Sequence, residues 1–217
     1  MEGVFIIIAG AVIIVGLIAL SVRHERQRTE KMNQIADELG MTFDAQGDHS
    51  VRRSLYQFRL FNRGRRRRFK NMLSGEKAGV TLAIFGYSYV TGSGKNSSTH
   101  QQTVFSFQSD SLRMPQFELC PEHVFHKIGQ AFGGKDIDFE SHPEFSKRFV
   151  LRGDNETEIR RFFTPERLAF FEGNDRIRME AQGNHFIVYR ARRRVKPEDL
   201  KGFMDEGFQW FNLLREV

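Results

Sequence analysis

The chain has 217 residues, a formal net charge of +6 and a single cysteine, Cys120. This length suits one sizeable domain with an extra segment or two small domains, and 22 phenylalanines can supply an apolar core. A lone thiol excludes an internal disulfide, so the composition gives no reason to expect an oxidising compartment.

The first element is an uncharged apolar run of 19 residues, 4–22. A helix of that length spans roughly the 30 Å hydrocarbon core of a bilayer. A cleaved secretory signal would carry positive charge before the run, whereas here Glu2 precedes it and Arg23, Arg26 and Arg28 follow it. We therefore expect residues 1–22 to form a retained transmembrane helix with a short N-terminal tail.

The same arginines predict the orientation of the chain. Lys and Arg next to a membrane span stay on its cytoplasmic side. This rule predicts a single-pass protein of the inner (cytoplasmic) membrane, with its N-terminus outside and its soluble domain in the cytoplasm.

Basic charge is concentrated directly after the apolar run. Between Arg23 and Lys70 there are 13 Lys or Arg against 6 Asp or Glu, whereas residues 71–217 carry equal numbers of each. Within this region, residues 23–40 are predicted to form a juxtamembrane basic helix that ends at Gly40. Its apolar stripe, spaced as one helix face, consists of Met32, Ile35, Ala36 and Leu39.

Four consecutive arginines, Arg65, Arg66, Arg67 and Arg68, are the candidate binding residues. The alternation of Tyr56, Phe58 and Leu60 predicts a strand before them, and residues 69–73 a second strand, so the run is expected in a hairpin turn. Anionic lipid headgroups are the favoured ligand because the run lies close to the predicted span. A solvated hairpin that only fixes topology is the alternative, and nucleic acid is the least favoured ligand.

The glycine-serine stretch at residues 92–97 resembles a phosphate-binding loop only superficially. Such a loop needs a glycine five residues before Gly94, where Tyr89 stands, a Ser or Thr after Lys95, and a helix after it. The residues that follow alternate as in a strand. We therefore expect an exposed hairpin tip.

Cys120, His123 and His126 are spaced by three on a predicted helix that begins at Pro121. With His100 and His142 they suggest a zinc site or a Cys/His-centred metal-dependent enzyme, but the spacing matches no familiar finger. One helix with exposed or satisfied histidines is the simpler interpretation. Asp136 and Asp138 could bind a cation, but the simpler interpretation is that they are carboxylates on a loop or an edge strand. We expect no metal, no cofactor and no catalytic set.

The C-terminal half predicts a strand at residues 148–153, helices capped by Asp154 or Asn155 and by Thr164, and a hairpin at residues 183–184. A last helix buries Trp210, and Gly207 in its apolar face suggests close approach of a neighbour. A second basic cluster consists of Arg190, Arg192, Arg193 and Arg194. The predicted fold class is α+β, with antiparallel hairpins and inserted helices in two lobes, 41–134 and 135–217.

Several stretches of the chain resemble a family of uncharacterised bacterial single-span membrane proteins that carry a cytoplasmic domain of unknown function. The resemblance lies in ELG-x-x-F, FGYSYVTGSGK with THQQTV, FHKIGQAFG with DIDFE, and TPERLAFFE. It implies bacterial origin and a cytoplasmic domain, and it brings no catalytic residues. The sequence thus predicts a membrane-tethered binding or scaffold module whose basic face meets anionic lipid or a partner protein.

Overall fold

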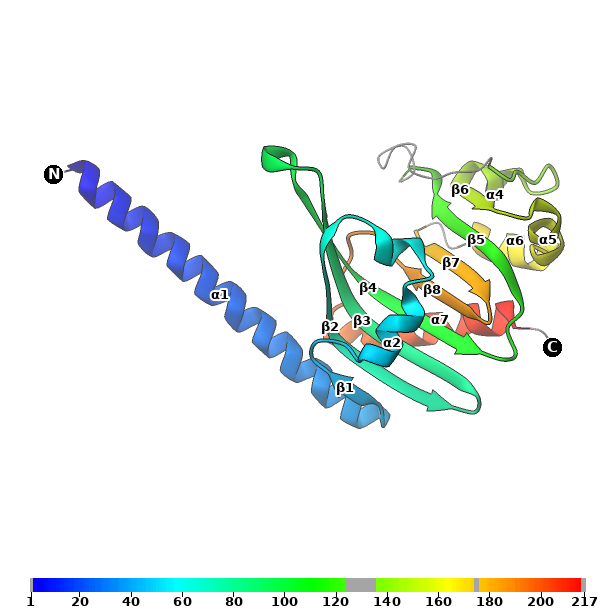
Figure 1. Cartoon of the computed structure of the whole chain (residues 1–217), viewed down its shortest axis with the longest axis horizontal. Helices are drawn as coiled ribbons and strands as arrows, with labels where there is room; N and C mark the ends of the chain where they lie inside the picture. Colours follow the sequence, from blue (N-terminus) through cyan, green and yellow to red (C-terminus); the bar gives the residue numbers. More distant parts are fainter. Residues whose placement is uncertain (1, 124–135, 174–175, 216–217) are drawn as a thin grey trace.

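The centre of the structure is one antiparallel sheet of eight strands in the order β1-β2-β3-β4-β8-β7-β5-β6 (Figure 1). The computed structural model describes residues 2–123, 136–173 and 176–215, with side chains from residue 10 onward. The predicted α+β class with antiparallel hairpins is confirmed. The strands are β1 (Thr42–Asp44), β2 (Arg65–Lys77), β3 (Val80–Thr91), β4 (Ser98–Ser109), β5 (Met114–Pro121), β6 (Phe149–Gly153), β7 (Arg178–Gly183) and β8 (His185–Tyr189).

The sheet runs through both halves of the chain. β4 pairs with β8, and β5 pairs with both β6 and β7, so strands from either side of residue 134 alternate in one sheet. Sequence order alone does not give this arrangement, because the pairing of β4 with β8 joins residues about 80 positions apart.

Helices cover both faces of the sheet (Figure 1). One face carries α7 (Leu200–Leu214), with α4 (Pro143–Arg148), α5 (Glu156–Phe162), α6 (Pro165–Glu172) and the end of α1 (Glu2–Leu39). The other face carries the short α2 (His49–Leu55) and the turn η1 (Arg59–Asn62). Two further helical turns are η2 (Gly94–Asn96) and η3 (Pro197–Asp199).

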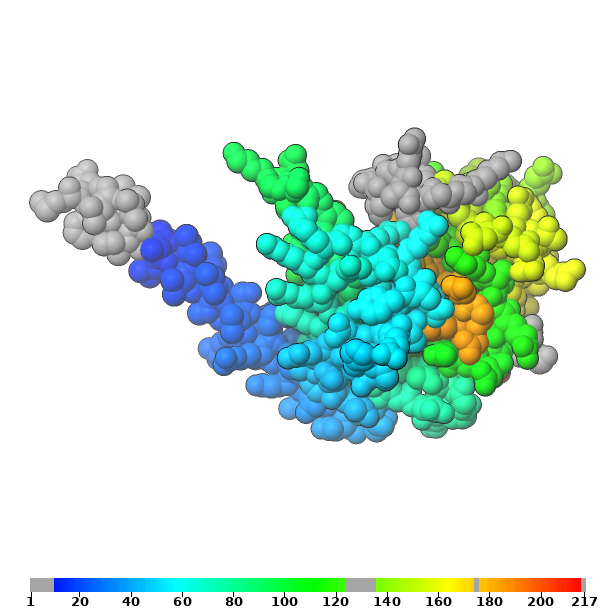
Figure 2. Space-filling view, viewed as in Figure 1, coloured from blue at the N-terminus to red at the C-terminus, as the bar shows by residue number. Residues whose placement is uncertain are grey.

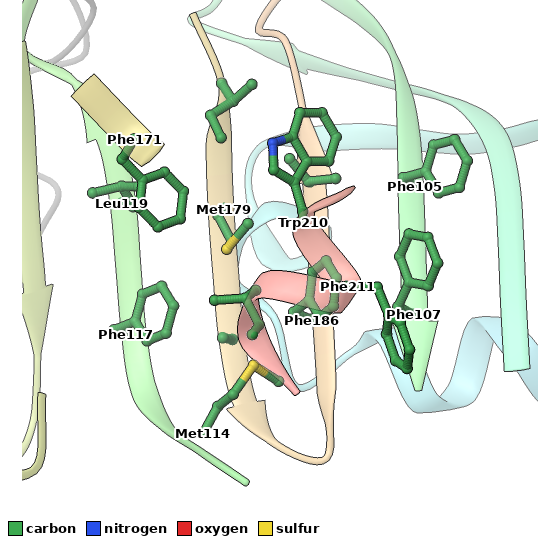
Figure 3. Close-up of a cluster of buried hydrophobic side chains, with 14 of the residues drawn as sticks. Phe105, Phe107, Met114, Phe117, Leu119, Phe171, Met179, Phe186, Trp210 and Phe211 are labelled. Carbon is green, nitrogen blue, oxygen red and sulfur yellow. The ribbon is translucent and has the colours of Figure 1, made fainter. Parts of the chain in front are cut away.

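The larger core lies between the sheet and α7 (Figure 3). Phe105 and Phe107 of β4 stack with ring centroids 5.2 Å apart, and Phe107 also meets Phe211 of α7 at 5.7 Å. Trp210 is 1% exposed, as predicted. Burial of such large aromatic side chains supplies the main favourable term of folding.

A smaller core lies on the opposite face, and the strand predicted at residues 56–60 is wrong. They form no strand: α2 is capped by Asp48, whose side chain accepts from Ser50 and Val51 N–H, and η1 follows. The reason is burial against the sheet: η1 brings Leu60 and Phe61 to 0% exposure and lets Leu60 N–H donate to the buried Glu180 of β7. The four arginines are accordingly the first residues of β2, not a hairpin turn.

The juxtamembrane helix predicted over residues 23–40 is the C-terminal part of the continuous α1. It ends as predicted at Gly40, whose φ is +64°. Gly40 N–H donates to Asp37 O and Met41 N–H to Ala36 O, the paired bonds of a Schellman motif. Met32 and Ala36 are buried in the larger core, so this end of α1 is part of the domain.

The other part of α1 projects away from the domain (Figure 1). Its apolar side chains from Val12 to Leu20 are between 58% and 66% exposed. Across the residues that the structure describes, we find no helix with a stretch long and apolar enough to traverse a bilayer. Residues 4–9, the start of the run interpreted as a span, lie outside the described side chains.

The predicted turns and caps at both hairpins and helix starts are confirmed. The tip at residues 92–97 joins β3 to β4, with Thr91 opposite Ser98, and the chain continues as a strand. Gly183 at the second tip has φ +62°. Asn155 and Thr164 accept N–H bonds at the starts of α5 and α6.

A valine at Gly207 should destabilise the fold. A Cβ there would lie 3.1–3.2 Å from ring carbons of Phe105 and Phe107, closer than ordinary contact. Overpacking of this kind costs about 1–3 kcal/mol, so we expect Gly207→Val to lower the free energy of unfolding by that amount in chemical denaturation. Gly202→Val in the same helix, where a Cβ meets nothing within 4 Å, is the matched control and should stay near wild type. Equal losses in both variants would contradict the close approach.

Candidate functional site

A large hollow of the described surface lies where α1 leaves the sheet. Two adjoining hollows, of about 820 and 330 Å³, are both lined by Ser21, Glu25, Arg68 and Lys70. The larger one extends over α1 and α2 to Arg52, and the smaller one extends over β3 and β4 to Arg194. We call the two together the α1 groove.

The α1 groove is strongly basic. Its lining side chains carry two carboxylates, Glu25 and Glu30, against six cations, which are Arg26, Arg52, Arg67, Arg68, Lys70 and Arg194. A hollow lined by one sign of charge concentrates counter-ions of the opposite sign. The groove can therefore attract anionic groups.

Glu25 makes ionic contacts with two basic residues of the groove. It accepts from Arg194 Nη1 at 2.6 Å and Nη2 at 3.1 Å, and Lys70 Nζ lies 3.7 Å from its second oxygen. The hydrogen bonds from Arg194 hold the pKa of Glu25 below its usual range, so this carboxylate is ionised at neutral pH. One side chain thus joins α1, β2 and the segment after β8.

The structure divides the four predicted arginines. Arg67 and Arg68 line the groove, and Arg67 donates to Phe61 O at 2.7 Å. Arg65 lies outside the groove and bonds the hairpin tip through Gly92 O and Ser97 Oγ. Arg66, with φ +53°, occupies a β-bulge next to it. Within the described part of the chain, no carboxylate lies within 4.0 Å of any of the four.

The second basic cluster is also divided, and part of it reaches the first. Arg194 lines the α1 groove beside Arg68. Arg192 donates to His100 Nδ1 at 3.3 Å and to Ser98 Oγ at 3.4 Å, near the hairpin. Arg190 instead pairs with Glu206 of α7 at 2.6 Å. The two clusters meet through Arg194.

Sequence reasoning missed Glu25 and Thr29 as the residues that attach α1 to the sheet. Thr29 Oγ1 lies 2.9 Å from Asn71 Oδ1 of β2. Both residues fall on the helix face that carries Met32 and Ala36, at spacings of four, three and four residues. That spacing is the signal that could have identified them.

Cys120 lies at the end of a strand. Cys120 and Pro121 are the last residues of β5, opposite Val150 and Phe149 of β6, so Pro121 is not the first helical residue as predicted; the helical residues Glu122 and His123 follow it directly. Strand pairing buries Cys120 to 4% exposure, and burial raises the pKa of its thiol to about 11. The thiol is neutral at physiological pH and therefore a poor nucleophile.

The histidines do not gather around Cys120. His123 is exposed, His126 lies outside the described residues, His100 stacks on Tyr89 at 4.6 Å, and His142 precedes α4. Asp136 accepts from Leu151 N–H at 2.9 Å, which is a structural role. In the part of the chain that the structure describes, no three His, Cys, Asp or Glu side chains are placed to hold a metal ion.

Two carboxyls, the half-buried Glu118 and the buried Glu180, face each other on β5 and β7. Glu118 pairs with Arg59 at 2.8 Å, and Glu180 accepts from Leu60 N–H at 3.2 Å. Burial raises the pKa of Glu118 to about 7 and raises that of Glu180 as well. The hollow beside Glu118 is about 20 Å³, room for roughly one water molecule. The pair therefore anchors η1 to the sheet and leaves no space for a substrate.

Comparison of the chain with protein-family models, with curated proteins and with solved structures finds no match. The candidate site therefore rests on its own geometry and charge.

The reactivity of Cys120 distinguishes a structural thiol from a nucleophile. In the folded full chain at pH 8 we expect alkylation by iodoacetamide to be at least about 100-fold slower than at an exposed cysteine, because the thiol is buried and its pKa is raised. The comparison variant is Cys120→Ser with Ser93→Cys, which places a thiol on the exposed hairpin tip. Rapid labelling of Cys120 without denaturant would show that the thiol is activated.

Proposed function

We propose that the protein is a membrane-tethered binding or scaffold module, not an enzyme, and that the α1 groove binds anionic lipid headgroups. Residues 1–22 anchor the chain in the inner membrane, and the α+β domain lies on the cytoplasmic side. The arginines that follow the apolar run support this orientation.

One observation carries the proposal: the basic groove begins where the exposed apolar surface of α1 ends. Ser21 and Val22 line the groove, and the exposed apolar side chains from Val12 to Leu20 come directly before them on the same helix. A helix whose apolar residues lie in lipid would hold the groove at headgroup level. Each Lys or Arg near an anionic surface adds about 1 kcal/mol of attraction.

The attachment of α1 to the domain supports the same function. Arg28 Nη2 donates to Val195 O at 2.8 Å, and Glu25 and Thr29 make the contacts described above. These bonds hold the helix to the sheet within one turn of the groove. Figure 2 shows α1 leaving the domain on the side from which the β3–β4 hairpin also projects. Membrane insertion of the helix would therefore orient the domain as well as tether it.

Membrane integration and topology test the anchor. We expect the full chain to stay in the membrane fraction after alkaline carbonate extraction. A C-terminal fluorescent protein should be active and a C-terminal alkaline phosphatase inactive, because the positive residues after the apolar run keep the domain in the cytoplasm. Replacing Arg23, Arg26 and Arg28 by Gln should weaken this bias. A chain released by carbonate, or an active phosphatase fusion, would refute the anchor as proposed.

Lipid selectivity tests the α1 groove. The detergent-solubilised full chain should bind a fluorescent phosphatidylglycerol, and unlabelled phosphatidylglycerol should compete better than phosphatidylcholine. In the double variant Arg67→Gln/Arg68→Gln we expect about 10–30-fold weaker binding, since two cations of about 1 kcal/mol each are lost.

The matched control for this test is Arg160→Gln/Arg161→Gln, which removes the same charge from α5. Its affinity for phosphatidylglycerol should equal that of wild type. Equal losses in both double variants would mean that only net charge matters, and unchanged binding in the groove variant would exclude lipid as its ligand.

A further inference from the structure

A second basic pocket lies at the ends of β5, β7 and β8, away from the α1 groove. It has a volume of about 160 Å³ and is lined by Pro121, His123, Arg176, Arg178, Arg190, Ala191 and Arg193. Four of these residues are arginines, and the described lining contains no Asp or Glu. The pocket shares no lining residue with the α1 groove.

Arg178 is the unusual member of this set. Its side chain is 3% exposed, yet Nε and Nη2 have no hydrogen-bond partner in the structure. Burying a guanidinium without a counter-ion is strongly unfavourable. An anion bound in the pocket would pair with the guanidinium of Arg178 and offset this cost.

Among the described residues, the neighbouring groups supply only part of that negative charge. Arg190 is already committed to Glu206 of α7 at 2.6 Å. Glu118 and Glu180 lie on the same face of the sheet as Arg178, but both have other partners, Arg59 and Leu60 N–H. Burial raises the pKa of both carboxyls, so they offset only part of the charge of Arg178 at neutral pH.

We propose that this pocket, with Arg178 at its base and Arg176, Arg193 and His123 around it, is a binding site for a phosphate group. Guanidinium groups pair with phosphate through two parallel N–H bonds, and several converging arginines favour a doubly charged oxyanion over chloride.

The size of the pocket narrows the ligand to a small group. A volume of about 160 Å³ is well below the roughly 300–1,000 Å³ of pockets that enclose drug-sized ligands. This suits a tetrahedral oxyanion, either free or at the end of a larger molecule such as a phospholipid. A whole nucleotide does not fit inside it.

Calorimetric titration of the detergent-solubilised full chain with inorganic phosphate, at constant ionic strength set by chloride, tests the site. Wild type should bind one phosphate. Arg178→Met, which keeps the apolar stem, should bind at least tenfold more weakly while its melting temperature stays equal or rises, because an unpartnered buried charge is gone. The exposed Arg193→Gln should weaken binding severalfold without any effect on folding.

Two control variants separate this pocket from its surroundings. Arg192→Gln removes a neighbouring arginine that bonds Ser98 and His100 outside the pocket, and Arg68→Gln removes a cation of the α1 groove. Both should bind phosphate as wild type does. Absence of phosphate binding in wild type, or wild-type affinity in both Arg178→Met and Arg193→Gln, would overturn the proposal. Loss of binding in Arg68→Gln with retention in Arg193→Gln would instead move the site to the groove and overturn it as well.

The source of the phosphate is decided by repeating the titration in lipid nanodiscs. If discs that contain phosphatidic acid lower the apparent affinity for inorganic phosphate relative to phosphatidylcholine discs, the pocket takes a lipid phosphate. If affinity is the same in both kinds of disc, it takes a soluble phosphate. Either result in wild type, abolished by Arg178→Met, supports the site.

Discussion

The ionic contact of Glu25 with Arg194 and Lys70 is the constraint on which the rest of the arrangement depends. It joins the N-terminal helix to β2 and to the segment after β8, and the hydrogen bonds from Arg194 keep its carboxylate ionised. Without this contact the turns of α1 next to the apolar run would have no polar attachment to Arg194 or Lys70. Together with the bonds of Arg28 and Thr29, it holds α1 beside the groove in which the two basic clusters meet.

The basic side chains of this protein lie in three different environments. Arg67, Arg68 and Arg194 line the open α1 groove, Arg65 and Arg192 bond the β3–β4 hairpin, and Arg178 lies buried at the strand ends. Open arginines suit a broad anionic surface, because they keep their hydration and pair transiently. A buried arginine suits one bound anion, because burial leaves its guanidinium with few water molecules as hydrogen-bond partners. The groove and the pocket are therefore complementary proposals about two kinds of contact.

The apolar core explains why these charged regions hold fixed positions. α7 packs against β4 so closely that Gly207 has no room for a side chain, and this fixes the segment between β8 and α7 that carries the second arginine cluster. On the other face, η1 is held by the hydrogen bond from Leu60 N–H to the buried Glu180 and by the burial of its own Phe61. Because the helices and η1 cover both faces of the sheet, the arginines gather at the ends of the strands.

Local sequence determined the features that depend on neighbouring residues. The Schellman stop at Gly40, the caps Asn155 and Thr164 and the two hairpin tips were all predictable, because each depends on backbone geometry within a few positions. Tertiary structure decided the rest. Residues 56–60 alternate like a strand but form the link from α2 to η1 and the start of η1, where Leu60 and Phe61 are both buried against the sheet. Cys120 belongs to a strand because β6 pairs with it from 30 residues away. The meeting of Arg68 with Arg194 depends on pairing between strands distant in sequence, and no local pattern encodes such a contact.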